Sequence, residues 1–339
     1  MKVCVTGVAG LIGSHLADAL LARGDEVYGV DNLIGGYEDN IPSGINWLNA
    51  DCNDFDAMYA ALDRCEVVYH CAALPYEGLS VFSPHLVTQG IVTASTGVFS
   101  AAIARGARRI IFCSSMSRYG KADPTPPWWR GFTEDRPTQP VDPYGIGKVC
   151  AEQLLANLAE IHGTEYAIVV PHNVTGPRAR YTDPFRNVAS IFIHRMLLGK
   201  QPIIYGDGQQ RRCFSSVRDV VDPICEIGTR DDCRGQVINI GPDHGEVTIN
   251  ELARRIAGLL DFDLDPIYLP DRPAEVKVAL CSAEKARRQL GYESRVGLDE
   301  NLAETIEWIR QRGVSGFDYH LPLEIVNERI PRAWSERLM

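Results

Sequence analysis

The sequence has no paired-cysteine motif, no excess of basic residues and no long apolar run, and each absence excludes a class of protein. Its ten cysteines are scattered without a Cys-x-x-Cys pair, so we expect reduced thiols in a cytoplasmic protein. Lys and Arg number 34 against 44 Asp and Glu, a net charge of −10. Neither nucleic acid nor a membrane is therefore an expected partner, because both attract basic surfaces. No apolar run approaches the ~18 residues of a membrane helix.

Two further signals are missing. The N-terminus, "MKVCVTG", enters a strand pattern at once, without the charged and apolar regions of a signal peptide. None of the eight histidines has the spacing of a metal site, so no metal is expected. With 339 residues of which 45% are hydrophobic, the chain is long enough for one large domain and a smaller lobe.

What is present is an alternation of short apolar runs with helical periodicity. "KVCVTG", "SHLADALLARG", "EVYGVDN" and "EVVYHCAA" illustrate it. This alternation predicts an α/β fold, a Rossmann-type doubly wound parallel sheet with a smaller C-terminal substrate-binding lobe. After about residue 172, loops rich in Arg, Pro and Gly break up shorter elements. The predicted parts are a Rossmann domain over 1–172, to which 214–241 returns, a substrate-binding lobe over 173–213 and 242–313, and a tail over 314–339.

A glycine pattern predicts the cofactor. Gly7, Gly10 and Gly13 follow the first strand and open the first helix, where glycines let a pyrophosphate approach the positive end of the helix. Asp31 ends the next strand, where an acid accepts both ribose hydroxyls and repels a 2′-phosphate. The pattern therefore predicts NAD rather than NADP, with a non-binding Rossmann-like domain as the alternative.

A second motif predicts catalysis. In "PYGIGK", Tyr144 and Lys148 lie four residues apart at the head of a helix, on one face. A phenol near pKa ~10 is a poor base at neutral pH, and a nearby ammonium favours the phenolate. Tyr-x-x-x-Lys alone often marks a solvated helix face. It becomes more specific beside the glycine loop and the Ser-rich strand end "SSMSRYG".

Together these motifs resemble the extended short-chain dehydrogenase/reductase family of nucleotide-sugar epimerases and dehydratases. The resemblance covers residues 1 to about 310 and includes "TGVAGLIG", "HCAA", "YGIGK", "HNVTGPR" and "DRPAEVK". It implies that Ser115 binds the reacting sugar hydroxyl, that Tyr144 accepts and returns its proton, and that Lys148 holds the cofactor ribose. The NAD contacts it implies are Gly7, Gly10, Leu11, Ile12, Gly13, Asp31, Asn32, Asp51, Cys52, Ala72, Ala73, Tyr144 and Lys148.

The same resemblance implies a UDP-sugar substrate. Arg212 and Arg272 match diphosphate contacts, and "QPIIYG" matches the segment on which uracil packs; scattered solvated arginines are the alternative. The implied substrate residues are Ser115, Ser117, Arg118, Asn173, Thr175, Arg186, Asn187, Val188, Gln201, Ile203, Tyr205, Arg212 and Arg272.

The residues after Ser115 favour one reaction. The family's 4,6-dehydratases carry an Asp-Glu pair there, because elimination needs an additional acid and base; this chain has Met116 and Ser117. We therefore expect an isomerase that epimerises C4 through a transient 4-keto sugar. Arg118 and Thr175 depart from the family pattern. Together with Arg186 and Ser117 they suggest a uronate, so that UDP-glucuronate is converted to UDP-galacturonate, although Arg118 could equally point to the surface.

Several alternatives stay open. The enzyme could be a UDP-glucose or UDP-GlcNAc 4-epimerase, or a nucleotide-sugar dehydratase or decarboxylase. From another class, the chain could be a catalytically silent NAD-binding scaffold. Segments 94–106 and 146–162 match helices that form a dimer interface in the family, so a homodimer is expected, although intramolecular packing fits them equally. Trp128 and Trp129 could shape a substrate loop or contact a partner.

Overall fold

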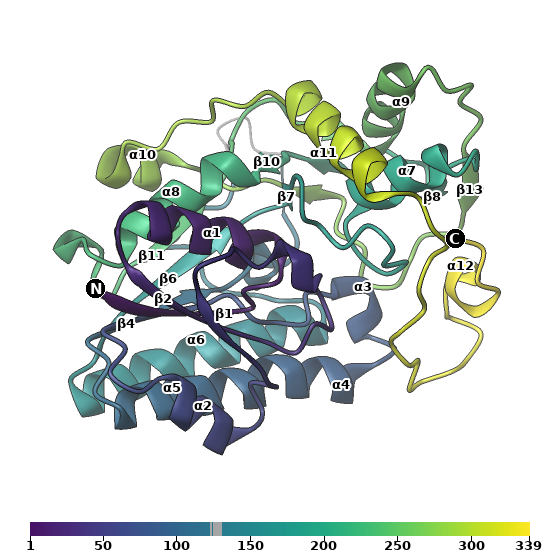
Figure 1. The fold of residues 1–339 in the computed structure, drawn as a ribbon. Coiled ribbons are helices and arrows are strands. Elements are labelled where there is room, and N and C mark those ends of the chain that lie inside the picture. The colour runs from purple at the N-terminus through teal and green to yellow at the C-terminus, as the bar shows by residue number, and fades with distance from the viewer. Residues whose placement is uncertain (123, 125–130) are drawn as a thin grey trace.

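The structure is a computed structural model that describes residues 1–122, 124 and 131–339. Within these residues the largest sheet has seven strands, all paired in parallel (Figure 1). From one edge to the other the strands are β11 (Val237–Ile240), β6 (Glu165–Pro171), β5 (Arg109–Cys113), β4 (Val67–His70), β1 (Lys2–Thr6), β2 (Glu26–Asp31) and β3 (Asn46–Asn49). The strand order reverses direction at β1, which confirms the predicted Rossmann-type fold. In such sheets ligands bind beyond the carboxyl ends of the strands at this reversal.

Helices cover both faces of this sheet, so its strands are apolar on both sides. On β1, Val3 and Val5 face one core and Cys4 faces the other. The first core includes side chains of α1 and α8, and the second includes side chains of α2, α5 and α6. The bounds are α1 (Leu11–Ala22), α8 (Val217–Ile227), α2 (Phe55–Ala61), α5 (Ala94–Ala104) and α6 (Pro143–His162).

One helical stretch is more apolar than the sequence patterns indicated. Helix α4 (Pro84–Thr88), the turn Gln89–Thr93 and α5 form a continuous stretch, Pro84–Ala104, that by length and composition alone could cross a membrane. In the fold, Val98 and Phe99 of this stretch are buried beneath the sheet. The segment therefore packs as the core helix of a folded domain does.

The second lobe packs above the carboxyl ends of the strands. Its core joins α7, α9 and α11 through side chains such as Phe192, Leu252 and Leu302. Helix α10 (Glu284–Leu290) belongs by sequence to the range expected for this lobe, yet Ala286 packs in the core that α1 and α8 form with the large sheet. The remaining bounds are α7 (Val188–Leu197), α9 (Ile249–Leu260), α11 (Leu298–Arg312), β8 (Ile203–Tyr205) with β13 (Ile267–Leu269), β7 (Val174–Thr175) with β10 (Ser215–Ser216), and β9 (Arg211–Arg212) with β12 (Val247–Thr248) and β14 (Val278–Ala279).

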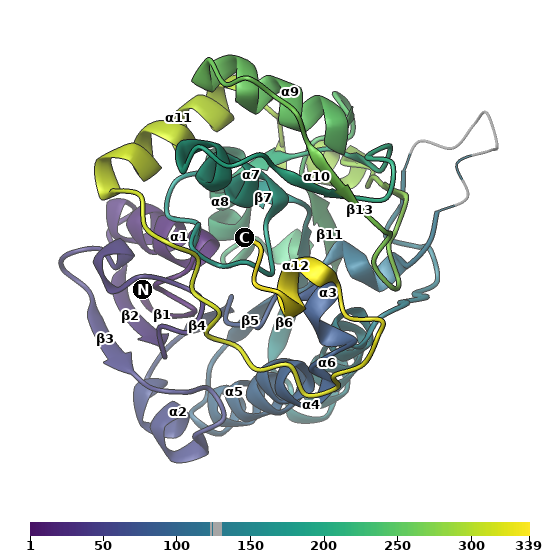
Figure 2. The ribbon, with the colours of Figure 1, turned by 90° about the vertical axis from the view of Figure 1, so that its right-hand side faces the viewer.

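The chain beyond residue 313 is a tail that ends in the short helix α12 (Arg332–Ser335). Figure 2 shows it leaving α11, passing in front of the large sheet near α4 and α3 (Glu77–Ser80), and returning to the second lobe, where the C-terminus lies. The tail therefore contacts both the start of α4 and helix α7 of the second lobe.

Candidate active site

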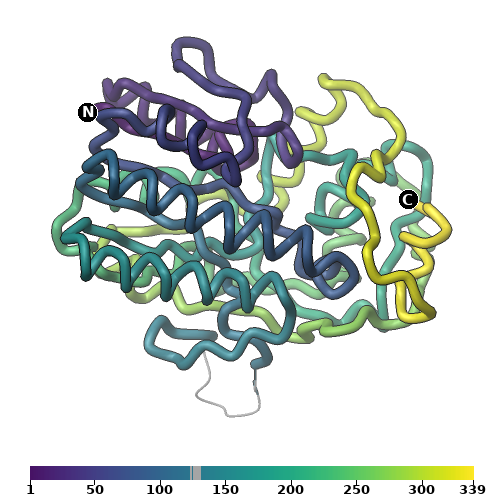
Figure 3. The backbone as a smooth tube through the Cα atoms, turned by 90° about the horizontal axis from the view of Figure 1, so that it is seen from below, coloured from purple at the N-terminus to yellow at the C-terminus, as the bar shows by residue number. Residues whose placement is uncertain are grey.

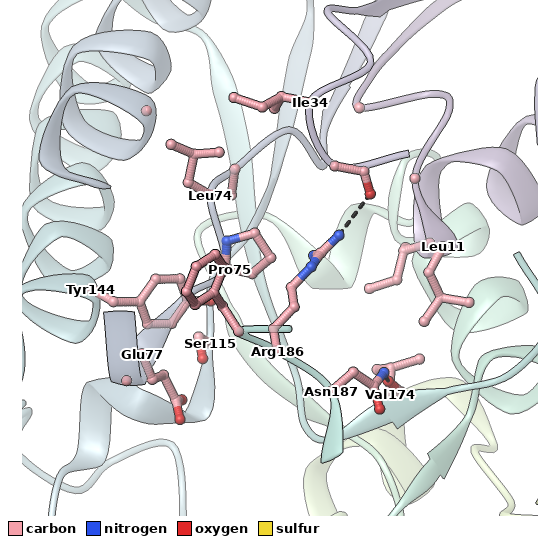
Figure 4. A pocket seen from close by; sticks show the side chains of 18 of the residues that line it. Leu11, Ile34, Leu74, Pro75, Glu77, Ser115, Tyr144, Val174, Arg186 and Asn187 are labelled. Atoms are coloured by element: carbon pink, nitrogen blue, oxygen red, sulfur yellow. Dashed lines mark hydrogen bonds between the residues drawn. The ribbon is translucent and has the colours of Figure 1, made fainter. Parts of the chain in front are cut away.

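A cavity of about 520 Å³ lies between the carboxyl ends of the strands and the second lobe. This size is typical of a site for a small molecule or cofactor. Figure 4 shows Ser115, Tyr144 and Glu77 on one side of the cavity, Leu11 and Asn187 on the other, and Arg186 between them. All residues predicted to contact NAD line this cavity, from the glycine loop to Lys148.

The glycine loop fits a dinucleotide pyrophosphate. Helix α1 begins after Gly10 without a side-chain cap, so the first-turn N–H groups have no acceptor within the helix. A Cβ on Gly13 would lie 2.1 Å from the carbonyl oxygen of Gly7, and one on Gly7 would lie 2.7 Å from the amide nitrogen of Ala72. Only glycine allows this close packing, which places the start of α1 at the edge of the cavity. Free N–H groups at the positive end of a helix suit a phosphate.

The side of the cavity that is predicted to bind adenosine is acidic. Asp31 accepts hydrogen bonds from the backbone N–H groups of Ala9 at 2.9 Å and Leu33 at 2.7 Å. Burial raises the pKa of Asp31, and these two N–H groups oppose the rise. Asn32 donates to Asp51 at 2.9 Å. Because a carboxylate has about four lone-pair positions, Asp31 can still accept from ribose hydroxyls.

The residues predicted to be catalytic meet at the end of β5 and the start of α6. Asp142 caps α6 by accepting from the N–H of Gly145 at 2.8 Å, which fixes Tyr144 in the first turn. One turn later, the Nζ of Lys148 donates to the carbonyl oxygen of Cys113 at 2.7 Å and lies 6.0 Å from the centre of the Tyr144 ring. Burial lowers the pKa of Lys148 to about 8.

The protonation of Tyr144 follows from its surroundings. Burial raises the pKa of Tyr144 above its ordinary value, and a hydrogen bond with Ser115 lowers it. The negative charges of Glu77 and Asp142 raise it further, while Arg186 lowers it. The protein alone therefore keeps this phenol protonated at neutral pH, and an added positive charge nearby would help to release the proton.

Glu77 is a cavity residue that the sequence motifs did not indicate. It begins α3, lines the cavity, and accepts a hydrogen bond from the hydroxyl of Ser117, 40 residues away in the chain. No local motif marks it, because only the tertiary fold brings α3 against the end of β5. It places a carboxylate beside the Ser115–Tyr144 pair.

Two arginines of the second lobe that line the cavity share one carboxylate. Arg272 pairs with Glu275 at 2.8 Å, and Arg212 approaches the other oxygen of the same carboxylate at 3.4 Å. Glu77 also lies close enough for its charge to raise the pKa of both arginines. Arginine suits phosphate oxygens. The other predicted substrate residues that line the cavity are Ser115, Asn173, Arg186, Asn187, Val188, Ile203 and Tyr205.

Four predicted substrate residues do not line the cavity. The side chain of Arg118 is buried and pairs with Glu152 of α6 at 2.9 Å, so it brings no charge to the substrate. Ser117 is turned toward Glu77, and Thr175 is fully buried on β7. Gln201 hydrogen-bonds the backbone of residues 263 and 265. Trp128 and Trp129 lie outside the described residues.

Arg186 connects the two lobes at the cavity. Its guanidinium donates to the carbonyl oxygen of Gly35 at 2.6 Å (Figure 4). It also pairs with Asp183 at 3.4 Å. The same group lies over the ring of Tyr76. Gly35 belongs to the loop that follows β2, so Arg186 ties the second lobe to the cofactor side of the cavity.

The sequence and fold match known enzymes. Residues 3–241 match the model of the NAD dependent epimerase/dehydratase family. The chain is 33% identical to a UDP-glucose 4-epimerase of Mycolicibacterium smegmatis, over 92% of this chain and 99% of that protein. It is 30% identical to a UDP-N-acetyl-alpha-D-glucosaminuronate decarboxylase of Bacillus cytotoxicus, over 91% of this chain and 98% of that protein. The fold also matches a mutant UDP-glucuronic acid 4-epimerase of Bacillus cereus, which was solved with UDP-4-deoxy-4-fluoro-glucuronic acid and NAD. The two structures superpose with a TM-score of 0.83 at 27% sequence identity, over 92% of this chain and 100% of that chain.

Proposed function

This chain belongs to the NAD-dependent epimerase/dehydratase family, and on that premise we propose that it epimerises C4 of a UDP-sugar. The observation that carries the proposal is the pair of hydroxyls of Ser115 and Tyr144 at the cavity wall, followed in sequence by Met116 and Ser117. The pair can handle one proton, which is all that oxidation and reduction at a single carbon require.

The roles of the residues follow from their places. Tyr144 accepts the proton of the sugar O4 while Ser115 holds that hydroxyl, and Tyr144 returns the proton when the 4-keto sugar is reduced. Lys148 lies beside Tyr144, where its ammonium favours the phenolate. NAD held at the glycine loop and Asp31 would supply reversible acceptance of the C4 hydride and a positive charge. Arg212 and Arg272 hold the diphosphate, so the sugar can turn over while the nucleotide stays bound.

The structure changes the substrate that we favour. The expectation of a uronate depended on Arg118 and Arg186 with Ser117 and Thr175. The charge of Arg118 is matched by Glu152 in the protein core, and Ser117 and Thr175 do not line the cavity. Arg186 does line it, and its charge is paired with Asp183. Glu77 lies beside Ser115 and Tyr144 at the cavity wall, where its charge repels a C6 carboxylate and its oxygens accept hydrogen bonds from sugar hydroxyls. We therefore propose a neutral substrate, UDP-glucose or UDP-GlcNAc, with UDP-glucuronate as the competing candidate.

Glu77 also supports a second candidate reaction. Met116 and Ser117 cannot act as acid or base, but Glu77 provides one carboxylate beside Ser117. A dehydratase or decarboxylase variant remains the second candidate for this reason, and it agrees with the decarboxylase among the relatives. Elimination of water requires both an additional acid and an additional base, so one carboxylate favours epimerisation.

A substrate panel tests the proposal. The purified protein is incubated with UDP-, dTDP- and GDP-sugars, and the products are separated and weighed by mass spectrometry. We expect C4 epimers of unchanged mass from neutral UDP-sugars and slower turnover of UDP-glucuronate. Loss of water or carbon dioxide would instead support the second candidate, and equal turnover of UDP-glucose and UDP-glucuronate would contradict the role given to Glu77.

We also propose that two copies of the chain associate through α5 and α6. These helices lie side by side on one face of the molecule (Figure 3), and Ile146 and Ile161 of α6 are 55% and 66% exposed. Large apolar side chains on a helix face suit contact with a second copy. Light scattering should show a dimer that Ile161→Lys weakens, and a monomeric wild-type protein would contradict this.

The cytoplasmic location stays a prediction from the sequence.

A further inference from the structure

A cluster of buried polar side chains adjoins the residues predicted to be catalytic. The hydroxyl of Ser114 donates to one carboxylate oxygen of Glu152, and Arg118 pairs with the other oxygen at 2.9 Å. The three residues are 5–6% exposed. Ser114 lines the cavity, whereas Glu152 and Arg118 do not, so the two charged side chains lie behind the cavity wall.

The charged pair in this cluster calls for an explanation beyond stability. Removing two charges from water is costly, and apolar residues of similar volume are often at least as stable as a buried ion pair. Stability alone therefore does not account for Arg118 and Glu152 at this place, and their neighbours supply the reason.

Ser114 connects the cluster to the strand end that carries the reacting groups. It lies between Cys113, the last residue of β5, and Ser115. The carbonyl oxygen of Cys113 accepts a hydrogen bond from Nζ of Lys148 at 2.7 Å. The hydrogen bond to Glu152 therefore fixes a segment that holds Lys148 through one neighbour of Ser114 and carries the catalytic hydroxyl on the other.

Glu152 also lies one helical turn beyond Lys148 on α6. Residues four apart on a helix have Cβ atoms about 5–6 Å apart, and Lys148 and Glu152 are 2% and 5% exposed. Burial lowers the pKa of Lys148 to about 8, while Cys113, Cys71 and the charge of Glu152 oppose that fall. A buried carboxylate at this distance stabilises the ammonium.

The other titratable groups that face Lys148 lie on β4, β5 and α6 or directly after them. They are His70, Cys71, Cys113 and Tyr144. Burial lowers the pKa of His70 to about 3, so its imidazole is neutral. The thiols of Cys71 and Cys113 lie 3.4 Å apart and share a hydrogen bond. Among these groups and Glu152, Glu152 is the one carboxylate.

We propose that Glu152 is a positioning residue for catalysis, because its carboxylate fixes the end of β5 and places a buried negative charge beside the ammonium of Lys148. Arg118 holds the same carboxylate through its other oxygen and does not touch the substrate. The inference rests on the proposed function in one respect, that Tyr144 needs this ammonium to release its proton.

The direct test measures kcat and KM of epimerisation against pH for Glu152→Gln, which keeps the shape of the side chain and removes its charge. Lys148 then loses its proton at a lower pH. The pH above which kcat falls should decrease by about one unit, the order expected for charges about 6 Å apart in a protein, with KM unchanged. Glu160→Gln is the matched control, because Glu160 is exposed about 12 Å further along the same helix, and it should leave the profile unmoved.

A second variant separates this role from stability. Glu152→Gln leaves Arg118 buried without its charge partner and can unfold the chain, whereas Arg118→Met with Glu152→Leu replaces both charges by apolar side chains. The thermal midpoint of this double variant should stay near that of the wild type, while its kcat should fall off at the lower pH. Both variants retain Cys71 and Cys113, so the shift does not come from the thiols. An unmoved pH profile in the folded double variant would overturn the proposal.

A third measurement needs no turnover and therefore separates this inference from the proposed function. Lys148 lines the cavity, so a small acetylating reagent can reach its neutral amine, and the acetylated fraction is read from the peptide mass at each pH. The midpoint of this reactivity should lie lower in both Glu152 variants than in the wild type, and equal midpoints would overturn the proposal. If the midpoint moves but the wild-type protein converts no UDP-sugar, the proposed function fails instead.

Discussion

Replacing Arg118 tests whether this residue stabilises the fold or contacts the substrate. Arg118→Met leaves the carboxylate of Glu152 buried with the hydroxyl of Ser114 as its remaining partner among the described contacts. The side chains of Arg118 and Glu152 are 8% and 6% exposed, and removal of one partner of such a buried pair costs about 3–5 kcal/mol. At about 2 °C per kcal/mol for a chain of this size, the thermal midpoint should fall by roughly 6–10 °C.

Two further variants test whether the loss of stability comes from the buried pair of Arg118 and Glu152. The double variant Arg118→Met with Glu152→Leu should recover most of the loss, because apolar replacement of both partners is often neutral or stabilising. Arg218→Met is the exposed control, since the Arg218 side chain is 52% exposed in its pairs with Glu300 and Glu304 and such pairs contribute about 1 kcal/mol or less. Calorimetry and steady-state kinetics are measured together. A variant with a wild-type midpoint and a raised KM for UDP-glucuronate alone would refute this reasoning.

Three other substitutions test the catalytic and cofactor residues. Tyr144→Phe should lower turnover by about 10²–10⁴-fold with an unchanged Kd for UDP; retained turnover in a coupled assay would contradict its role. Glu77→Gln removes a charge that raises the pKa of Tyr144, so the pH at which kcat is half-maximal should move down; an unmoved pH profile would place Glu77 away from the phenol. Gly13→Ala puts a Cβ 2.1 Å from the Gly7 oxygen, so NAD binding should be lost by fluorescence titration, and normal binding would contradict the packing described for the loop.

The parts of the site that the sequence predicts are those set by local geometry. Gly7 and Gly13 must follow a strand and open a helix, and Tyr144 and Lys148 need only one helical turn to lie on one face. These residues therefore occupy the cavity as expected. The parallel sheet is also predictable from local sequence, because apolar strand patterns alternate with helical patterns along the chain.

The residues that the sequence did not place depend on distant contacts. Arg118 follows Ser115 by three residues, yet its direction is set by Glu152 on α6. Glu77 and Trp334 reach the cavity only because α3 and the tail fold against the ends of the strands. No sequence spacing predicts these tertiary contacts. A motif can therefore indicate the reaction class without identifying the sugar or all the residues that line the cavity.

The most direct test of the central claim follows a deuterium label at C4 of UDP-glucose. If Tyr144 moves the O4 proton and the C4 hydride returns within the same site, the product is UDP-galactose of unchanged mass with the deuterium still on C4. Nuclear magnetic resonance and mass spectrometry of the product give this result directly. Loss of the label to solvent, or a product lighter by water, would contradict epimerisation through a transient 4-keto sugar.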